Sequence, residues 1–288
     1  MTAQVPANVP PIDDWNQLLA NKVAVVTGGG DGIGGAIARL FAQHGAQVEI
    51  AEIDPARAEA CVDAINGASD IAGRAHAHVI DVRDDGAVGT FRDAVVLRHN
   101  RVDVLVNNVG DYRPLVRFAE SNADSWHAMY EVNLRHLFSV THAFLPAMIA
   151  SGGGSIVNLH SVEGTRGFPG EPVYAAMKAG ATHFTTSLAA GYGRKGIRCN
   201  GIAPDLTQTP QVDYLTGYEE HDHLWEAWAP VGRLGWPMDT ARVALFLASD
   251  LSAFVTGHNI AVDGGSLSQS GWFYSPDAGR FVNRPKGL

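Results

Sequence analysis

The stretch VAVVTGGGDGIGGAIARLF, residues 23–41, sets the architecture of this chain. Its first four residues form a continuous apolar run, which is typical of a strand buried on both faces of a parallel sheet. The glycines that follow let the backbone turn tightly, and the segment from Gly35 onward has helical character. A strand, a glycine loop and a helix in this order indicate a dinucleotide-binding fingerprint, because a helix N-terminus attracts a pyrophosphate. The alternative is a glycine-rich turn that binds no ligand.

Apolar runs and helical segments alternate along the rest of the chain. This alternation predicts an α/β fold: a single Rossmann-type, doubly wound parallel sheet of about seven strands with helices on both faces. Ligands of such sheets bind at the carboxyl ends of the strands. The expected strands are 23–27, 47–51, 75–81, 103–107, 155–160, 197–203 and 258–262, and the expected helices are 34–43, 55–66, 84–100, 124–150, 173–194 and 239–248.

A second pattern lies in SIVNLHSVEGTRGFPGEPVYAAMK, residues 155–178. Tyr174 and Lys178 are four positions apart, so on a helix they lie on one face, one turn from each other. Ser161 follows the predicted strand, and its hydroxyl can therefore face the phenol of Tyr174. Such a group suits the transfer of a proton to or from an oxygen atom. A Tyr-x-x-x-Lys pattern by itself is common on helix surfaces, and its weight comes from its agreement with the glycine loop.

The ionisation of tyrosine explains why a lysine belongs beside it. A phenol has a pKa near 10, and bringing it to neutrality requires a shift of roughly 3 units, about 4 kcal/mol. A cation within about 4–6 Å supplies roughly 1–3 units. Lys178 is therefore expected to provide most of the shift. A second positive charge, such as an oxidised nicotinamide ring, would supply the remainder.

Further motifs occur in the order and spacing of one large family. They are TGxxxGxG (Thr27, Gly28, Gly32, Gly34), NNVG at residues 107–110 where the family has NNAG, Asn133, the Ser161, Tyr174 and Lys178 set, and VDGG at residues 262–265. On these residues the chain resembles the classical short-chain dehydrogenase/reductases. The resemblance runs from about Lys22 to Gly265 and implies one catalytic domain at 22–265, an N-terminal extension at 1–21 and a C-terminal tail at 266–288.

The resemblance also implies a role for each catalytic candidate. Tyr174 is expected to be the general acid in ketone reduction and the general base in alcohol oxidation, while Ser161 hydrogen-bonds the substrate oxygen. Lys178 is expected to lower the pKa of Tyr174 and to hold the nicotinamide ribose hydroxyls. Asn133 is expected to hold a water that links Lys178 to solvent, which requires a helix kink there. The alternative for Asn133 is a helix-interior amide bonded to backbone.

Charges near the glycine loop indicate which cofactor is bound. The predicted second strand ends at Glu52, whose carboxylate can accept hydrogen bonds from the adenosine ribose hydroxyls and would repel a 2′-phosphate. Relatives that use NADP often carry a basic residue before the middle glycine, where this chain has Asp31. The two carboxylates favour NAD(H), although most relatives have Asp in place of Glu52. Asp54 is expected to cap a turn or helix, and Asp81 to contact adenine or, alternatively, to be a turn residue.

The full set of expected cofactor contacts follows from the resemblance. It comprises Thr27, Gly28, Asp31, Gly32, Ile33, Gly34, Glu52, Asp81, Val82, Asn108, Gly110, Tyr174, Lys178, Pro204, Thr207 and Thr209.

The segment after the predicted sixth strand departs from the family pattern. Relatives usually have Pro-Gly there and a threonine five residues after the proline, whereas this chain has Pro204 followed by Asp205. Thr209 occupies the place of the family threonine and is expected to meet the nicotinamide carboxamide, together with the backbone of Thr207. Either Asp205 takes a positive φ, which Asp tolerates better than most residues, or it points into the site and disfavours anionic substrates.

Residues 205–237 are expected to form a substrate lid. They include Tyr214, Tyr218, Trp225 and Trp228, and an apolar aromatic surface suits a bulky, uncharged alcohol or ketone. The alternative is that these aromatic side chains pack into the core or into a subunit interface.

Three histidines and the end of the chain have simpler interpretations. His221 and His223 lie among acidic residues with no closed ligand set, so an exposed helix turn and no metal site are expected. His160 is expected to be a packed residue rather than a catalyst. Residues 272–274, WFY, are too aromatic for a solvated tail. The tail is expected to dock on its own subunit or to reach a neighbour's site, and the resemblance to a commonly tetrameric family favours the second and implies a homotetramer.

Composition limits the class of protein. With 46% hydrophobic and 18% charged residues, the 288-residue chain is expected to form a compact globule that buries roughly 75% of its unfolded surface. A net charge of −9 disfavours nucleic acid or an anionic membrane as a partner, and no apolar stretch approaches the roughly 18 residues of a membrane span. Residues 1–21 lack the features of a signal peptide. Cys61 and Cys199 indicate free core thiols in a reducing, cytoplasmic compartment.

Together these observations predict an NAD(H)-dependent oxidoreductase that interconverts a secondary alcohol and a ketone on a mid-sized, largely apolar small molecule. Steroid, terpenoid, sugar and aryl alcohols remain open. One alternative is an enzyme similar to 3-oxoacyl-carrier-protein reductase, against which the acidic charge and the pair of Asp31 and Glu52 argue. The other is a dinucleotide-binding regulator without catalysis, against which the intact Ser–Tyr–Lys set argues.

Overall fold

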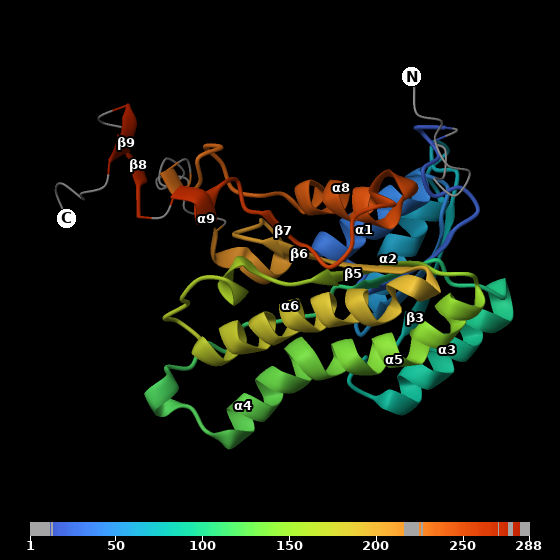
Figure 1. The fold of residues 1–288 in the computed structure, drawn as a ribbon, viewed down its shortest axis with the longest axis horizontal. Coiled ribbons are helices and arrows are strands. Elements are labelled where there is room, and N and C mark those ends of the chain that lie inside the picture. The colour runs from blue at the N-terminus through green and yellow to red at the C-terminus, as the bar shows by residue number, and fades with distance from the viewer. Residues whose placement is uncertain are drawn as a thin grey trace.

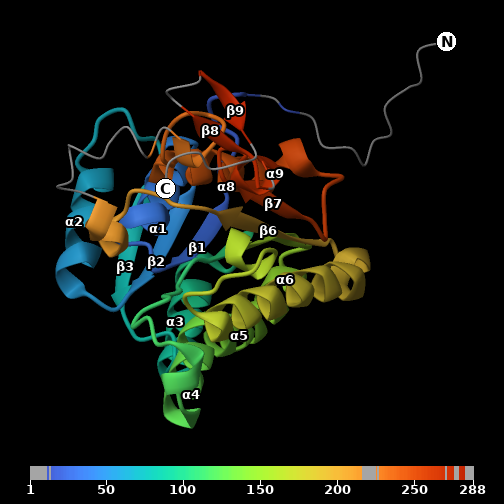
Figure 2. The same ribbon diagram turned by 90° about the vertical axis from the view of Figure 1, so that its left-hand side faces the viewer.

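A computed structural model describes residues 12, 14–215, 225, 227–269, 271–275 and 279–282. The strands of the main sheet are β1 (Val23–Thr27), β2 (Gln47–Glu52), β3 (Arg74–Val79), β4 (Val104–Asn107), β5 (Gly154–Leu159), β6 (Ile197–Pro204) and β7 (Asn259–Val262). All neighbours are parallel, in the order β3-β2-β1-β4-β5-β6-β7 (Figures 1 and 2). The strand order reverses between β1 and β4, and the crevice at such a switch point is where doubly wound sheets bind ligands. The predicted fold class is confirmed.

Helices cover both faces of this sheet, as Figure 2 shows. One face carries α1 (Gly32–Gln43), α2 (Pro55–Asn66) and α8 (Pro237–Ala248), and the other carries α3 (Asp85–His99), α5 (His136–Ala150) and α6 (Pro172–Tyr192). Shorter elements in the described part of the chain include α4 (Ala123–Tyr130), α9 (Ser266–Gln269) and the 3-10 turns Phe118–Glu120, Val162–Gly164, Gly193–Lys195, Pro210–Leu215 and Asp250–Ser252. None of the described helices is both long enough and apolar enough to cross a membrane.

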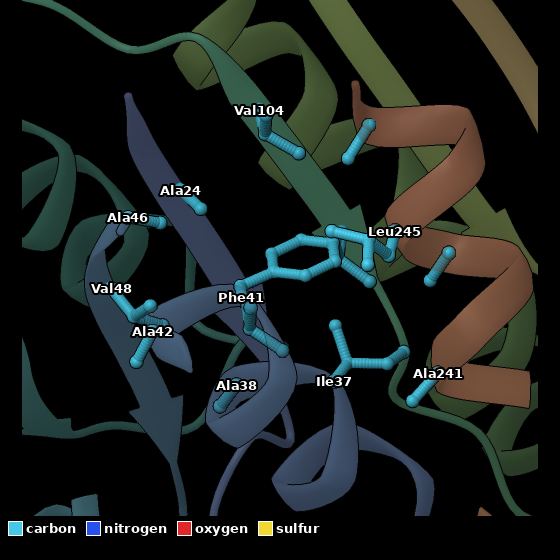
Figure 3. Packing of buried hydrophobic residues seen from close by; sticks show 14 of the residues in the cluster. Ala24, Ile37, Ala38, Phe41, Ala42, Ala46, Val48, Val104, Ala241 and Leu245 are labelled. Carbon is cyan, nitrogen blue, oxygen red and sulfur yellow. The ribbon is translucent and has the colours of Figure 1, made fainter. Parts of the chain in front are cut away.

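The core between α1, α8 and the sheet is centred on Phe41 (Figure 3). Ile37 and Phe41 are one turn apart on α1, and both side chains are fully buried. In Figure 3 the Phe41 ring lies between Val104 of β4 and Leu245 of α8. Burying a side chain of this size contributes roughly 1.5–3 kcal/mol. This packing fixes the position of α1, and with it the glycine loop that precedes α1.

The helix predicted at 124–150 is a continuous run of three parts. A π-helical turn at Glu131–Arg135 joins α4 to α5, and a π-turn leaves a local irregularity in the helical hydrogen bonds. Asn133 lies in this turn. The irregularity that its predicted role requires is therefore present.

The strand predicted at 75–81 is two residues too long. β3 ends at Val79, and the carboxylate of Asp81 accepts the backbone N–H of Arg83 at 2.9 Å. This turn-forming bond, typical of aspartate, places Asp81 in a turn and not in the strand.

The chain ends in a hairpin of β8 (Phe273–Ser275) and β9 (Arg280–Val282), which pair antiparallel. In Figure 1 the hairpin stands apart from the main sheet. Whether the tail reaches a neighbouring subunit stays a prediction, as do the proposed domain limits.

Candidate active site

Three catalytic candidates come together at the carboxyl end of β5. Ser161 follows β5 after one residue, and Tyr174 and Lys178 lie one turn apart near the start of α6. The Ser161 hydroxyl lies close enough to the phenol of Tyr174 to act on its pKa, which it lowers. The Lys178 ammonium lies over the Tyr174 ring, with Nζ 5.6 Å from the ring centroid. The three side chains thus form one contiguous set, and their catalytic role stays a prediction.

Lys178 is a buried cation. The residue is 3% exposed, and Nζ donates a hydrogen bond to the carbonyl oxygen of Leu159 at 3.2 Å. Burial lowers the pKa of Lys178 to about 8, because desolvation disfavours the charged form. A β-carbon on Gly110 would lie 2.8 Å from Nζ. The absence of a side chain at Gly110 therefore leaves the space that the Lys178 ammonium occupies.

The protein's own groups keep Tyr174 protonated. Burial raises the pKa of Tyr174 to about 12, and the charges of Glu163 and Asp111 act in the same direction, whereas the nearby Ser161 hydroxyl opposes them. The expectation that Lys178 brings the phenol most of the way to neutrality is not met by the protein alone. Desolvation is the largest cause of the raised pKa of Tyr174, and the two nearby carboxylates add to it.

Asn133 joins the π-turn to the loop after β4. Its Nδ2 donates to the carbonyl oxygens of Asp111 at 2.7 Å and Met129 at 3.1 Å, and its Oδ1 accepts the N–H of Asp111 at 3.1 Å. The amide is thus bonded to backbone, as in the simpler of the two interpretations. Its Oδ1 also lies 3.1 Å from the position that a β-carbon on Gly110 would take, which places Asn133 beside the Lys178 ammonium.

The glycine loop before α1 is shaped by close backbone contacts. Gly28 has a φ of +60°, a value that glycine adopts without strain. A β-carbon on Gly34 would lie 2.0 Å from the carbonyl oxygen of Gly28, so α1 starts directly against the loop. Asp31 caps α1 by accepting the N–H of Gly32 at 2.6 Å, and Ile33 packs against the core. A tight loop before a helix N-terminus suits a pyrophosphate.

Thr27 and Asn108 hold the ends of β1 and β4 together. Thr27 Oγ1 accepts the N–H of Asn108 at 3.0 Å. The Asn108 amide nitrogen donates to the carbonyl oxygens of Thr27 at 3.1 Å and Gly28 at 3.0 Å. In this structure both side chains therefore support the shape of the loop.

Glu52 closes β2 directly beside the glycine loop. It is 7% exposed, and its carboxylate accepts the N–H groups of Gly30 at 3.1 Å, Ile53 at 2.9 Å and Asp54 at 3.2 Å. A β-carbon on Gly30 would lie 2.8 Å from Cγ of Glu52. These bonds place a negative charge at the side of the loop where an adenosine ribose is expected. Asp54 caps α2, as predicted.

Asp81 and Val82 lie in the loop after β3. The Asp81 carboxylate is chelated by the Arg83 guanidinium, at 2.7 Å for the Nη2–Oδ2 pair, and this hydrogen bond lowers the pKa of Asp81. Asp81 therefore acts as a turn residue in this structure, which was the alternative interpretation of it. Val82 is buried at 6% exposure.

The segment after β6 passes close to the glycine loop. Pro204 is the last residue of β6. Thr207 is buried, and its hydroxyl donates to the carbonyl oxygen of Asp205 at 2.8 Å. Thr209 faces Gly32, whose added β-carbon would lie 3.6 Å from the threonine Cβ. Thr209 thus lies beside the glycine loop.

Asp205 does not use the backbone conformation of a glycine. Among the described residues, the non-glycines with positive φ are Asn21 and Asn100, so the first of the two alternatives for Asp205, a positive φ, does not hold. Its side chain is 6% exposed and pairs with Arg166 at 3.0 Å. Asp205 therefore contributes to this structure through its carboxylate and not through an unusual backbone conformation.

Comparison with known proteins places this geometry in a family. Residues 28–266 match the model of the family described as enoyl-(acyl carrier protein) reductase. The chain is 39% identical to the 3-oxoacyl-[acyl-carrier-protein] reductase FabG of Thermotoga maritima over 86% of this chain and 98% of the relative. Among solved structures, a short-chain dehydrogenase/reductase from Burkholderia xenovorans superposes with a TM-score of 0.80 at 36% identity, over 88% and 98% of the two chains. The chain belongs to the short-chain dehydrogenase/reductase family.

A second solved relative carries ligands. It is a 7α-hydroxysteroid dehydrogenase complexed with NADH and 7-oxo glycochenodeoxycholic acid, with a TM-score of 0.81 at 32% identity, and the match covers 88% of this chain and 98% of that one. As a member of this family, the protein is an oxidoreductase of the kind that binds a nicotinamide dinucleotide and acts on small molecules.

Four residues near Tyr174 were not singled out by the analysis of the sequence. Tyr112 and Phe168 lie edge-on to the Tyr174 ring, with centroids 6.3 and 6.1 Å away. Glu163 and Arg166 form an ion pair at 2.7 Å in the loop after β5. A signal existed only for the last two, an acidic and a basic residue three apart just after Ser161.

Other predictions have mixed outcomes. His160 is 4% exposed, and its ring nitrogens bond Asn259 Oδ1 at 2.8 Å and Thr185 Oγ1 at 2.9 Å, so it is a packed residue as expected. Within the described residues no three His, Cys, Asp or Glu side chains could hold a metal ion together. The side chains of Tyr214 and Tyr218 and the pair His221 and His223 lie outside the described part of the lid segment.

Proposed function

We propose that the protein is an NAD(H)-dependent oxidoreductase that interconverts a secondary alcohol and a ketone on a mid-sized, largely apolar molecule. The observation that carries the proposal is the contiguous set of Ser161, Tyr174 and Lys178 at the carboxyl end of β5. The family supplies the reaction class, and this chain's own residues supply the cofactor preference and the substrate character.

The residues that face the crevice fit a nicotinamide dinucleotide. Gly34 lets α1 start directly against the glycine loop, and Gly110 leaves room for the Lys178 ammonium, so both glycines shape the part of the crevice where the pyrophosphate and the nicotinamide ribose would lie. When bound, the cofactor supplies the hydride acceptor or donor. Thr209 and the backbone of Thr207 would meet the carboxamide, and Lys178 would hold the ribose hydroxyls next to it.

The proton chemistry falls to Tyr174. In ketone reduction its hydroxyl donates a proton to the carbonyl oxygen, while the Ser161 hydroxyl orients that oxygen and stabilises the charge that develops on it. In alcohol oxidation Tyr174 must first lose its proton, which a pKa of about 12 opposes. The protein by itself therefore favours the acid role, and oxidation requires added positive charge near the phenol.

NAD(H) rather than NADP(H) is proposed because of Glu52. Its carboxylate, 7% exposed and held by three backbone N–H groups, would accept hydrogen bonds from ribose hydroxyls and would repel a 2′-phosphate. The variant Glu52→Gln is expected to raise the affinity for NADPH relative to NADH by about tenfold, while the exposed Glu59→Gln on α2 leaves the ratio unchanged. An NADPH affinity equal to that for NADH in the parent protein would overturn the assignment.

The 3-oxoacyl-carrier-protein reductase named among the relatives is the second candidate. An acidic carrier protein requires a basic docking surface, and a net charge of −9 argues against one, as Glu52 argues against NADPH. A regulator without catalysis is the third candidate, and the intact Ser–Tyr–Lys set argues against it. Homotetramer formation and a cytoplasmic location stay predictions.

One experiment separates the three candidates. Nicotinamide absorbance is followed with NAD and NADP in parallel against steroid, terpenoid, sugar and aryl secondary alcohols, with a 3-oxoacyl thioester and NADPH as the competing pair. Turnover of an alcohol with NAD that Tyr174→Phe abolishes, while NADH still quenches tryptophan fluorescence, supports the proposal. Turnover only of the thioester supports the second candidate, and NADH binding without any turnover supports the regulator.

A further inference from the structure

An ion-pair network borders the catalytic set on the side of β6. Arg166, in the loop after β5, pairs with Glu163 at 2.7 Å and with Asp205, the first residue after β6, at 3.0 Å. The Asp205 carboxylate also accepts hydrogen bonds from Trp228 Nε1 at 3.1 Å and from the hydroxyl of Ser266. Four segments far apart in the sequence thus meet at one carboxylate.

The network holds an aromatic side chain at the site. The Arg166 guanidinium carbon lies 5.9 Å from the centroid of the Trp228 ring, a distance at which a cation and an aromatic face attract each other. Trp228 is 38% exposed. Its ring is therefore fixed at two points, by Asp205 at Nε1 and by Arg166 at its face.

The network begins next to the reacting groups. Glu163 is two residues after Ser161, and its backbone N–H donates to the Ser161 hydroxyl at 3.1 Å. The charge of the Glu163 carboxylate is also one of those that raise the pKa of Tyr174. Arg166 contacts Glu163 directly, and Asp205 is connected to Glu163 through Arg166. A change of charge at either residue therefore acts close to the place where a substrate oxygen is expected.

The charges in the network leave a negative surplus. Among the described residues of the network, two carboxylates, Glu163 and Asp205, face one guanidinium, that of Arg166. The Arg166 guanidinium is thus already paired with two carboxylates of the protein, so it does not bind an anionic group of a substrate. The second carboxylate that acts on Tyr174, Asp111, is matched by Arg113 at 3.1 Å.

We propose that Asp205 and Arg166 form a specificity-determining pair that makes the substrate site reject carboxylate-bearing molecules and accept uncharged alcohols and ketones. The inference rests on the proposed oxidoreductase function and narrows its substrate class. Asp205 acts by occupying the guanidinium that would otherwise bind an anionic group and by adding a negative charge. The same carboxylate positions Trp228, which offers an apolar wall to an uncharged substrate.

The test uses two ketones of the same size that differ in charge, 4-acetylbenzamide and 4-acetylbenzoate. Their dissociation constants are measured by calorimetry on the protein saturated with NAD⁺, in which a ketone cannot be reduced. The proteins are the parent, Asp205→Asn, Arg166→Gln, and Asp93→Asn as a control in an exposed ion pair on α3.

The two variants break the same ion pair, one by removing the negative charge and the other by removing the positive charge. A loss of structure would therefore change the ratio of the two dissociation constants in the same direction in both variants. The charge argument predicts opposite shifts. The parent is expected to bind the amide at least about tenfold more tightly than the acid. This preference should be smaller by a factor on the order of ten in Asp205→Asn and larger by a similar factor in Arg166→Gln, because each substitution removes one unit charge at short range in a partly screened site. Asp93→Asn should match the parent.

The inference would be overturned if the parent bound the two ketones with equal affinity or bound neither of them. It would also be overturned if both variants changed the affinity ratio in the same direction. The proposed oxidoreductase function fails separately, by the absence of any turnover in the alcohol panel. The affinity ratio does not depend on turnover, so the two failures are distinguishable.

Discussion

Replacing Glu49 by glutamine removes a negative charge that lies inside the sheet. Glu49 is in the middle of β2, its side chain has no solvent exposure, and His78 of β3 and His99 and Arg98 of α3 surround its carboxylate. Each partner has a nitrogen within 2.6–2.8 Å of a carboxylate oxygen. The charge is compensated only in the folded protein, so its contribution to stability depends on pH.

The magnitude follows from the pKa. Burial alone would raise it, but the hydrogen bonds from His78, Arg98 and His99 outweigh burial and lower the pKa of Glu49 from 4.5 to about 2. A carboxyl group whose pKa is lower in the folded than in the unfolded protein stabilises the fold at pH values above its unfolded-state pKa. This stability is lost as the pH falls through its folded-state pKa. A shift of roughly 2.5 units corresponds to about 3 kcal/mol, of which about 2 kcal/mol disappears between pH 7 and pH 3.

Urea unfolding of the parent and of Glu49→Gln at pH 7, 5, 4 and 3 tests this. The variant should be less stable by about 3 kcal/mol at pH 7, and the difference should shrink steadily below pH 5. Glu59→Gln, an exposed carboxylate on α2, should follow the parent at every pH. A difference between parent and Glu49→Gln that stays constant from pH 7 to pH 3 would refute the reasoning, because it would show that packing and not charge sets the cost.

Two further predictions concern the site. Because the pKa of Tyr174 is raised to about 12, the initial rate of alcohol oxidation should increase with pH between pH 6 and 8 while that of ketone reduction stays level; equal pH profiles in the two directions would contradict this. Gly34→Ala should abolish NADH quenching of tryptophan fluorescence, since its β-carbon would lie 2.0 Å from a carbonyl oxygen of the glycine loop. Gly89→Ala in α3, where a β-carbon meets nothing within 4 Å, should preserve binding and stabilise the fold by roughly 0.5–1 kcal/mol.

Local patterns were sufficient for the fold and for the order of its elements. Strand, glycine loop and helix are neighbours in sequence, and the periodicity of apolar residues depends only on backbone geometry. Tyr174 and Lys178 could be paired for the same reason, since a helix places residues four apart on one face. Strand and helix ends were predicted less well, because they depend on side-chain bonds such as that of Asp81 to the N–H of Arg83.

Contacts across the fold decided the rest. A glutamate in a buried strand has no explanation in its own segment, and the partners of Glu49 lie 29 to 50 positions away. Asp205 is similar, because the sequence left a backbone role and a side-chain role open, and its ion pair is with Arg166, 39 positions earlier. The protonation of Tyr174 depends on burial and on Asp111 and Glu163, which sequence spacing does not reveal.

The amino-acid sequence by itself thus determined the doubly wound sheet, the glycine loop and the catalytic set, because these depend on backbone conformation and short-range spacing. Only the tertiary structure decided which charges meet and which of them are buried. Electrostatic energies depend on distance and on exposure to water, and both quantities arise when strands and helices distant in sequence pack together. The charge balance at Arg166 and the protonation state of Tyr174 are both consequences of that packing.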